Sequence, residues 1–340
     1  MSNERDTRFN AINERMKYKY RIHLKRIGRK DAKTVNEELK HLRYYERFTA
    51  FESFKTFSEM VAEKYINQLL ADDKSLSYID DNLRALRGFL IWLKEQRGYK
   101  SSISYNHIQY LGLTNNQRRT AKSKEYKMAY KYEQIITAIR NMPSNTVKDK
   151  RDRAMASLQA LCGLRIGELR TVKIKNLVQE DGQYFIFVHP KDMSVKFAKQ
   201  RQANFMPLPE DIKRNVLEWM EYLRAQGFKK TEPLFPQISA RFNQHNLLDK
   251  TLTLHEIKSD TTIRDIFKRV FEAAEMEYIN PHSFRHTMAR FAERQKPEFL
   301  NAVRQSLGHS SIDTTLNSYG QLSNYEQTKR FSETVIAFEW

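Results

Sequence analysis

The feature that most limits the fold of this 340-residue chain is a helical pattern of apolar residues that gives way to a strand-like pattern in one stretch. Through most of residues 33–93 and 212–307, apolar side chains recur every three or four positions, which is the spacing of one helix face. Between residues 170 and 209 the runs Tyr-Phe-Ile-Phe-Val (184–188) and Asn-Phe-Met-Pro-Leu (204–208) are strand-like instead, and an Asp-Gly turn signal precedes them. We therefore expect a mainly α-helical protein with a small antiparallel β-sheet.

The length and the patterning together predict two domains. A chain of 340 residues can form two domains that each bury a core. The helical stripes predict an all-helical domain over residues 31–112, preceded by a basic and aromatic extension at 1–30. Residues 113–131 lose the periodicity and gather cations, which predicts a basic linker. The second domain is expected over 132–325, with a tail at 326–340.

The strongest bulk signal is positive charge. Lys and Arg total 59 against 41 Asp and Glu, for a net charge of +18. Such an excess favours a polyanionic partner, and nucleic acid is the commonest one. No run approaches the roughly 18 apolar residues of a membrane span, and the N-terminus lacks an apolar signal core. The single cysteine, Cys162, excludes an internal disulfide and fits a small buried hydrophobe. We expect a cytoplasmic protein with no membrane partner.

Three short clusters carry residue types that suit the breaking of a phosphodiester. They are Cys-Gly-Leu-Arg-Ile-Gly-Glu-Leu-Arg (162–170), Pro-His-Ser-Phe-Arg-His-Thr (281–287), and Leu-Gly-His (307–309) followed by Tyr319. Cutting DNA requires a nucleophile, cations that hold the charged transition state, and a proton donor for the leaving oxygen. Arginine binds two phosphate oxygens at once, histidine can donate a proton, and a tyrosine ester keeps the energy needed for religation.

The spacing places several of these groups on shared helix faces. Arg165 and Glu168 are three residues apart, as are His282 and Arg285, so one helix face can present the second pair to a single phosphate. An ordinary ion pair is the plainer interpretation of Arg165 and Glu168. His282 and His286 have the spacing of a zinc site, but the sequence contains no His-Glu-x-x-His motif. We expect neither a metal nor a cofactor.

The chain resembles the tyrosine recombinases, also called phage-type integrases. The family's Gly-Leu-Arg-x-x-Glu-Leu run is matched at 163–169, its His-x-x-Arg-His run at 282–286, and its Leu-Gly-His run at 307–309, with a later tyrosine. The resemblance implies the tyrosine-recombinase catalytic domain, and the N-terminal helices resemble the family's all-helical core-binding domain.

The resemblance also implies a role for each matched residue. The family tyrosine more often lies nine residues after the histidine, a place that Ser318 takes here, and Tyr319 is the nearby phenol. Tyr319 would be the nucleophile, and Arg165 and Arg285 would hold the scissile phosphate. His282 and His309 would bind the phosphate and assist proton transfer, and Glu168 would be a supporting carboxylate.

The family's hairpin lysine, the acid for the leaving 5′-oxygen, has three candidates in this chain. Lys191 is preferred because Val188-His189-Pro190-Lys191 best resembles the end of the first hairpin strand. Counting back from Pro207 favours Lys199 instead, and Lys196 is the third candidate.

The implied activity is site-specific recombination through a covalent 3′-phosphotyrosine and a Holliday junction, serving a mobile genetic element. A type IB topoisomerase and a non-catalytic DNA-binding relative are the alternatives. The expected partners are double-stranded DNA with specific sites, accessory DNA-bending proteins, and further copies of the chain, which is a monomer when free and a tetramer on synapsed DNA.

The apolar segment 331–340 could dock on a neighbouring protomer or pack on its own domain. Linker cations expected to follow the phosphate backbone are Arg118, Arg119, Lys122, Lys124 and Lys127.

Overall fold

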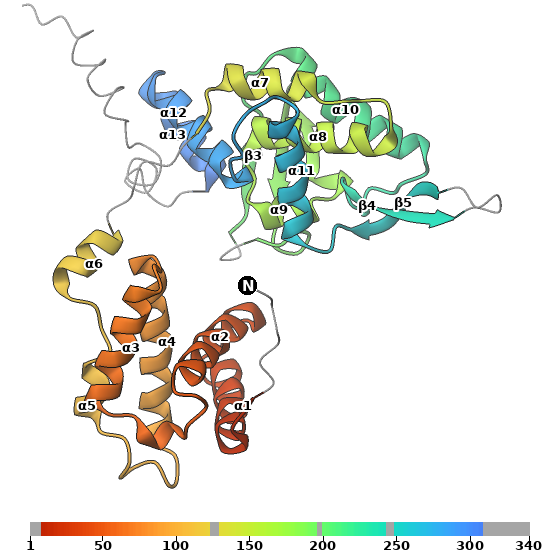
Figure 1. Cartoon of the computed structure of the whole chain (residues 1–340). Coiled ribbons are helices and arrows are strands. Elements are labelled where there is room, and N and C mark those ends of the chain that lie inside the picture. The colour runs from red at the N-terminus through yellow and green to blue at the C-terminus, as the bar shows by residue number, and fades with distance from the viewer. Residues whose placement is uncertain (1–7, 123–128, 196–198, 243–247, 309–340) are drawn as a thin grey trace, which may run out of the picture. The chain divides into compact units, whose positions relative to one another are not determined.

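The structure is a computed structural model that describes residues 8–122, 129–195, 199–242 and 248–308 (Figure 1). The chain divides into two compact units, Met1–Lys124 and Glu125–Trp340. Each unit has a hydrophobic core of its own, as expected of a domain. No helix among the described residues is long and apolar enough to cross a membrane.

The described part of the first unit is all-helical. Its first four α-helices begin at Asn10, Asp31, Ser58 and Ser75, whose side-chain oxygens accept hydrogen bonds from N–H groups in the first turn. The helices are α1 (Ala11–Arg26), α2 (Ala32–Phe48), α3 (Glu59–Ala71), α4 (Leu76–Lys94), α5 (Tyr105–Gln109) and α6 (Asn115–Lys122), with a short 3-10 turn at Phe54–Thr56.

Helix α1 is part of the core of the first unit, which corrects the prediction that residues 1–30 form a separate extension. Tyr20 of α1 is buried and meets Phe89 of α4 edge-on, with 5.2 Å between ring centroids. Lys17 of α1 forms a buried ion pair with Glu46 of α2. The many cations of this segment obscure its apolar stripe, which consists of Met16, Tyr20 and Leu24.

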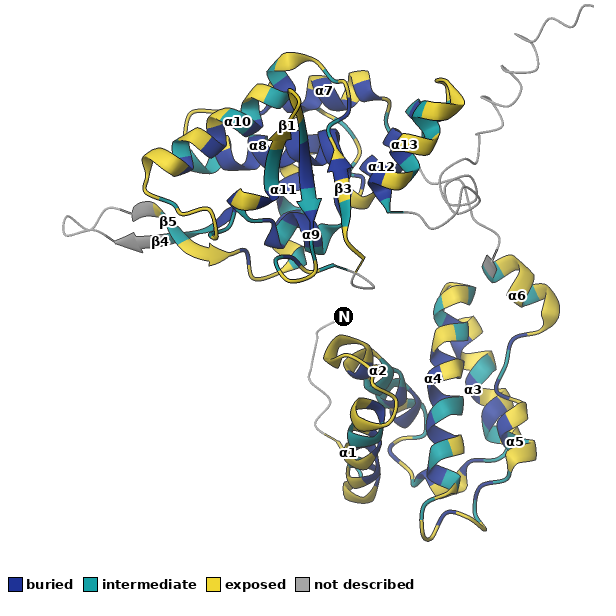
Figure 2. Ribbon diagram, turned by 180° about the vertical axis from the view of Figure 1, so that it is seen from behind, coloured by how far each residue is buried: buried dark blue, intermediate teal, exposed yellow. Residues whose placement is uncertain are grey.

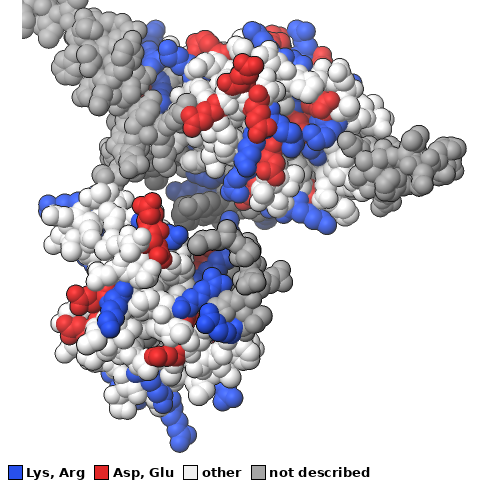
Figure 3. Space-filling view, in the orientation of Figure 1, with Lys and Arg blue, Asp and Glu red and all other residues white. Residues whose placement is uncertain are grey.

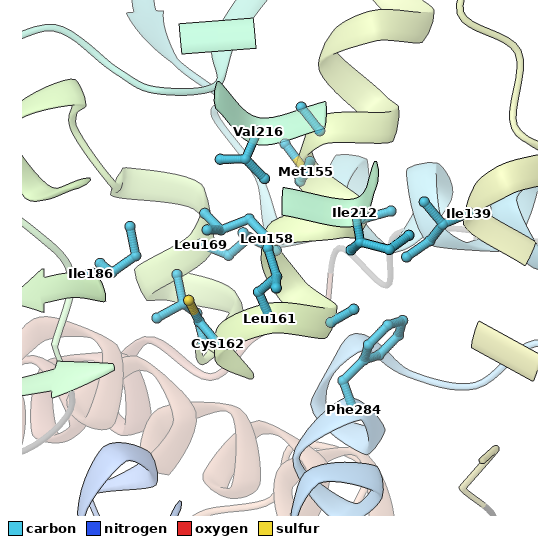
Figure 4. Packing of buried hydrophobic residues seen from close by; sticks show 14 of the residues in the cluster. Ile139, Met155, Leu158, Leu161, Cys162, Leu169, Ile186, Ile212, Val216 and Phe284 are labelled. Carbon is cyan, nitrogen blue, oxygen red and sulfur yellow. The ribbon is translucent and has the colours of Figure 1, made fainter. Parts of the chain in front are cut away.

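The second unit is built around α8 (Val147–Cys162), whose residues 154–162 are all buried (Figure 2). A helix that is buried on every side forms the centre of a domain. Figure 4 shows Leu158 and Leu161 of α8 within a cluster that also includes Ile186 and Phe284. Cys162 is fully buried, as predicted, and burial raises the pKa of its thiol.

Several of the other described helices of the second unit pack against α8, and the sequence clusters lie on or beside the rest. They are α7 (Tyr132–Asn141), α9 (Ile166–Thr171), α10 (Glu210–Ala225), α11 (Asp260–Glu272), α12 (Phe284–Glu293) and α13 (Pro297–Leu307), with 3-10 turns at Ile174–Asn176 and Pro281–Ser283.

Two small antiparallel sheets complete the described part of this unit, which confirms the predicted fold class. The first has the order β1 (Leu177–Glu180), β2 (Gln183–Val188) and β3 (Arg201–Asn204). Strand β3 ends at Asn204, the first residue of the predicted run 204–208, although the N–H of Phe205 still donates to the carbonyl of Tyr184. The second sheet, β4 (Pro236–Phe242) with β5 (Leu248–Glu256), was not predicted.

The predicted linker 113–131 is mostly divided between the two units. Leu113 is buried in the core of the first unit, and α6 packs against α4. On the other side, the Tyr130 hydroxyl donates to the carbonyl of Glu277, and Thr287 donates to the carbonyl of Tyr130. The loss of periodicity and the charge of this stretch predicted a basic linker, but α6 shows that a charged segment can form a helix on a domain surface.

Candidate active site

Gly163 lets segments from all three sequence clusters come together. It ends α8 in a left-handed conformation with a φ of 54°, which glycine adopts readily. A β-carbon at this position would lie 2.4 Å from the sulfur of Met288 and 3.3 Å from side-chain carbons of Arg285 and Leu307. Because residue 163 has no side chain, the end of α8 can lie directly against α12 and α13.

Arg285 joins the same three segments by hydrogen bonds. Its side chain is fully buried, its Nη1 donates to the carbonyl of Gly163 at 2.7 Å, and its Nη2 donates to the carbonyl of Leu307 at 2.6 Å. The amide of Gln159 adds bonds to the carbonyls of Leu164 and Pro281. The backbone around the first and second clusters is therefore held by buried donors.

Arg165 lies at the start of α9 and is oriented by Glu168. Its backbone N–H donates to Glu168 Oε2 at 2.8 Å, and its Nη1 donates to Glu168 Oε1 at 3.1 Å. The Arg165 side chain is 26% exposed, whereas that of Glu168 is fully buried. The carboxylate thus holds the guanidinium from the protein side, while part of the Arg165 side chain remains accessible.

Arg201, at the start of β3, is a site residue that the sequence did not reveal. Its Nη1 and Nη2 donate to the two carboxylate oxygens of Glu168 at 2.8 and 2.7 Å, and its Nε donates to the carbonyl of Ser306 at 2.8 Å. The sequence offered only an indirect indication of Arg201: a carboxylate such as Glu168, if it is buried, requires cationic partners. The hairpin offers several cations, so the signal could not have named one.

Burial and charge act in opposite directions on Glu168. Burial favours the protonated carboxyl and would raise its pKa. The hydrogen bonds and the charge of Arg201, together with the N–H and the charge of Arg165, outweigh that effect and hold the pKa of Glu168 below its usual value. Glu168 is therefore an ionised group between two arginines at neutral pH.

Gly308 brings the chain that leads to His309 close to these arginines. It ends α13 in a left-handed conformation with a φ of 72°. A β-carbon here would lie 2.8 Å from Cδ of Arg201 and 3.9 Å from Nη1 of Arg165. The last described residue is thus in contact distance of the Arg165 and Arg201 side chains.

His282 and Arg285 differ in their surroundings, although their spacing suggested a shared face. His282 is exposed within the 3-10 turn Pro281–Ser283, and its backbone N–H donates to Asn280. Arg285 lies in the first turn of α12 and is buried. The His282 ring meets the buried His286 ring nearly at right angles, with centroids 6.0 Å apart. Among the described residues, no group of three or more His, Cys, Asp or Glu side chains could hold a metal ion.

The model of the phage integrase family matches residues 129–326, more than half of the chain. The chain belongs to this family, the tyrosine recombinases. As a member it is a DNA strand transferase, so the predicted family and enzyme class are confirmed.

Three curated relatives of this tyrosine recombinase have similar levels of identity. The probable integrase/recombinase aq_aa09 of Aquifex aeolicus is 26% identical over 321 residues, or 90% of this chain and 95% of that protein. Transposase A from transposon Tn554 of Staphylococcus aureus is 26% identical over 74% of this chain, which spans 60% of the transposase. Tyrosine recombinase XerC of Staphylococcus haemolyticus is 23% identical, with 82% and 81% covered.

Solved structures share the fold of this recombinase. A lambda integrase tetramer bound to a Holliday junction superimposes with a TM-score of 0.63 at 16% identity, covering 92% of this chain and 79% of that one. XerH recombinase bound to its difH substrate has a TM-score of 0.57 at 19% identity, covering 87% and 77%.

The remaining predicted residues of the recombinase stay predictions. Lys191 and Lys199 are exposed on either side of residues 196–198, and the backbone N–H of Lys191 donates to His189. Arg118 and Arg119 are exposed on α6 of the first unit, and the backbone of Lys122 ends that helix. Outside the described residues lie Lys124, Lys127, Lys196, His309, Tyr319 and the segment 331–340.

Proposed function

We propose that this recombinase cuts and rejoins DNA at specific sites through a covalent 3′-phosphotyrosine formed by Tyr319. The observation that carries the proposal is the contact of segments from all three clusters around Gly163 and Arg285. These segments are far apart in the sequence, with 122 positions between Gly163 and Arg285. Membership of the phage integrase family supports the same activity.

The accessible part of Arg165 is the group best placed to bind the scissile phosphate. Its fork can donate to two phosphate oxygens while Glu168 holds its inner side. Arg285 was also expected to hold the phosphate, but its side chain is fully buried and donates to the carbonyls of Gly163 and Leu307. In this proposal Arg285 therefore supports the site from the protein interior, where it fixes the backbone and adds positive charge. A fixed cation stabilises the extra charge of the pentacoordinate phosphorus without reorganising during the reaction.

Each strand cut exchanges one phosphoester for another. The phenolic oxygen of Tyr319 bonds to phosphorus, the bond to the 5′-oxygen breaks, and that oxygen leaves with a proton from a donor, for which Lys191 is the candidate. His282 and His309 bind the phosphate and assist proton transfer. Attack by a 5′-hydroxyl reverses the step, releasing the phenol and rejoining the strand.

The recombinase would act as a tetramer on two synapsed duplexes and pass through a Holliday junction. The fold shared with a lambda integrase tetramer bound to a Holliday junction supports this assembly. Its similarity to the transposase of Tn554 supports a role in a mobile genetic element.

Covalent trapping on suicide substrates tests the proposal. Duplexes from the DNA that flanks the gene are nicked at staggered positions, so that the released fragment diffuses away and the protein–DNA ester accumulates. We expect an SDS-resistant complex with the wild type and none with Tyr319→Phe, because phenylalanine has no nucleophilic oxygen. Tyr325→Phe, which removes the next phenol along the chain, is the control and should form the complex normally.

Intact duplexes and plasmids that carry the same DNA sequence distinguish the alternative functions. Strand exchange between two duplexes identifies a recombinase, whereas relaxation of supercoiled plasmid without exchange identifies a topoisomerase. Salt-sensitive DNA binding without any covalent complex would show a non-catalytic DNA-binding protein and would overturn the proposal.

A further inference from the structure

The side chain of Arg201 joins three segments that surround the candidate site. It lies at the start of β3, opposite Val188 at the end of β2, so the hairpin register fixes its place. Its guanidinium donates two hydrogen bonds to Glu168 in the first turn of α9 and one to the carbonyl of Ser306 in α13. The Arg201 side chain is only 6% exposed.

Backbone contacts of β3 strengthen the connection to α13. The N–H of Asn204 donates to the hydroxyl of Ser306 at 2.9 Å, so both ends of β3 are bonded to the same residue. Two residues after Ser306 the chain turns at Gly308, which lies against the Arg201 side chain. Strand β3 therefore holds the end of the helix from which the chain continues to His309.

Stability alone is a weak reason for this buried ion pair. Taking a carboxylate and a guanidinium out of water costs about as much as their attraction returns, and well-packed apolar residues often stabilise a protein as well. What an apolar pair cannot provide is direction. The fork of Arg201 fixes the plane of the Glu168 carboxylate, whose two oxygens in turn accept from the backbone and side chain of Arg165.

We propose that Arg201 is a positioning residue for the recombination reaction, which orients Arg165 through Glu168 and holds the end of α13 at Ser306. The inference rests on the proposed function. Because its side chain is only 6% exposed, Arg201 would act through Glu168 and not by contacting the DNA. Because Arg201 begins β3 directly after the segment that carries Lys191 and Lys199, it also connects that hairpin to Arg165.

Removing Arg201 should make the reaction depend on the protonation of Glu168. Two charged groups, Arg165 from its own turn and Arg201 from β3, hold Glu168 ionised. Without Arg201, burial outweighs the remaining partner, so the pKa of Glu168 rises and the protonated carboxyl loses its hold on Arg165. Other titratable groups near Glu168 should not produce the same pH dependence. The Cys162 thiol is buried, and burial raises its pKa. Asp260 of α11, a helix that packs against α9, is paired with Arg170.

The test compares Arg201→Met, Arg201→Lys and a matched control, Arg140→Met. Arg140 makes a similar two-bond pair with Asp211, at 2.7 and 2.9 Å, but it lies on the surface and outside the candidate site. For each variant we would measure the melting temperature, the Kd for noncovalent binding of the duplex used for trapping, and the rate of covalent-complex formation as a function of pH.

We expect Arg201→Met to slow covalent-complex formation about 100-fold, the size of effect that a small misplacement of a reacting group produces. Its Kd should stay near that of the wild type, and its rate should rise with pH over a range where the wild type is flat. Arg201→Lys keeps the charge without the fork and should recover part of the rate. Arg140→Met should match the wild type in rate and in pH profile.

Several results would overturn the inference. One is a folded Arg201→Met protein that traps DNA at the wild-type rate. Another is a loss of rate accompanied by an equal loss of DNA affinity and an unchanged pH profile, which would indicate a merely structural role. If Arg201→Met does not fold, the rate and pH profile of Arg201→Lys decide the question. A wild type that traps no DNA would instead overturn the proposed function, and this inference with it.

Discussion

At the scale of single residues, Gly163 is the glycine at which an added β-carbon would come nearest to another described atom. Substitution by alanine has two costs: the left-handed backbone costs about 1–3 kcal/mol for a residue with a side chain, and the new β-carbon must displace the buried Met288 sulfur that would lie 2.4 Å away. We therefore expect Gly163→Ala to lower the free energy of unfolding, as measured by urea denaturation.

Gly182 provides a matched control for that prediction. It has a φ of +75° at the turn between β1 and β2, but a β-carbon there would have no atom within 4 Å. Gly182→Ala should therefore show the backbone cost alone and unfold at a higher urea concentration than Gly163→Ala. Equal losses of stability in the two variants would mean that the contacts of Gly163 with Met288 and Arg285 have no energetic weight.

Residue identities in the candidate site were predictable where short motifs carry them. Arg165, Glu168 and Arg285 were predicted from their match to the family's motifs, and the structure brings their segments together. Arg201 was not predictable, because its bond to Glu168 spans 33 positions and depends on the register of β2 with β3. Nothing in the local sequence distinguishes it from the other cations of the hairpin.

At the scale of elements, the bond between β3 and α13 can be tested through Ser306. Ser306→Ala removes the oxygen that accepts from the N–H of Asn204, which should cost about 1 kcal/mol. The loss should also slow covalent trapping several-fold, because the end of α13 gains freedom. The effect should be smaller than that of Arg201→Met, since the bond from Arg201 to the Ser306 carbonyl remains.

Ser157 is the matched control for Ser306. It is a buried serine of α8 whose hydroxyl accepts from Asn215 of α10 at 3.0 Å. Ser157→Ala should lower the melting temperature about as much as Ser306→Ala but leave the trapping rate unchanged. If both variants trap DNA equally slowly, the rate follows stability and the position of α13 has no separate effect.

The elements themselves were predicted unevenly. Helical periodicity identified most of the long helices, because each buries one regular apolar stripe. The hairpin of β4 and β5 escaped notice since its residues are largely polar and lack a clear alternation of apolar and polar positions. Strand β3 was predicted too late in the chain because apolar residues after it, including Phe205 and Met206, resemble a strand although they pack beyond its end.

At the scale of the whole molecule, the positive net charge does not exclude acidic side chains from the face that Figure 3 shows. Figure 3 shows Lys and Arg side chains on both units, with Asp and Glu interspersed among them on the same face. The net charge predicted an anionic partner, but it could not predict which side chains would meet it. Nor could it reveal that α1 belongs to the first core, because burial depends on packing against α2 and α4.

The two separate cores predict that each unit folds alone and that DNA binding depends on both. Fragments 1–124 and 129–340 should each unfold cooperatively, at a temperature close to one of two transitions in the full chain.

The full chain should bind duplex DNA more tightly than either fragment, because linked modules raise each other's effective concentration. Its affinity should fall steeply with added salt, with a steeper slope than that of either fragment, because more phosphates are contacted. We would measure the transitions by calorimetry and the salt slope by fluorescence anisotropy. A fragment that does not fold would show that the two units are not independent. A full chain with the salt slope of one fragment would show that only one unit binds DNA.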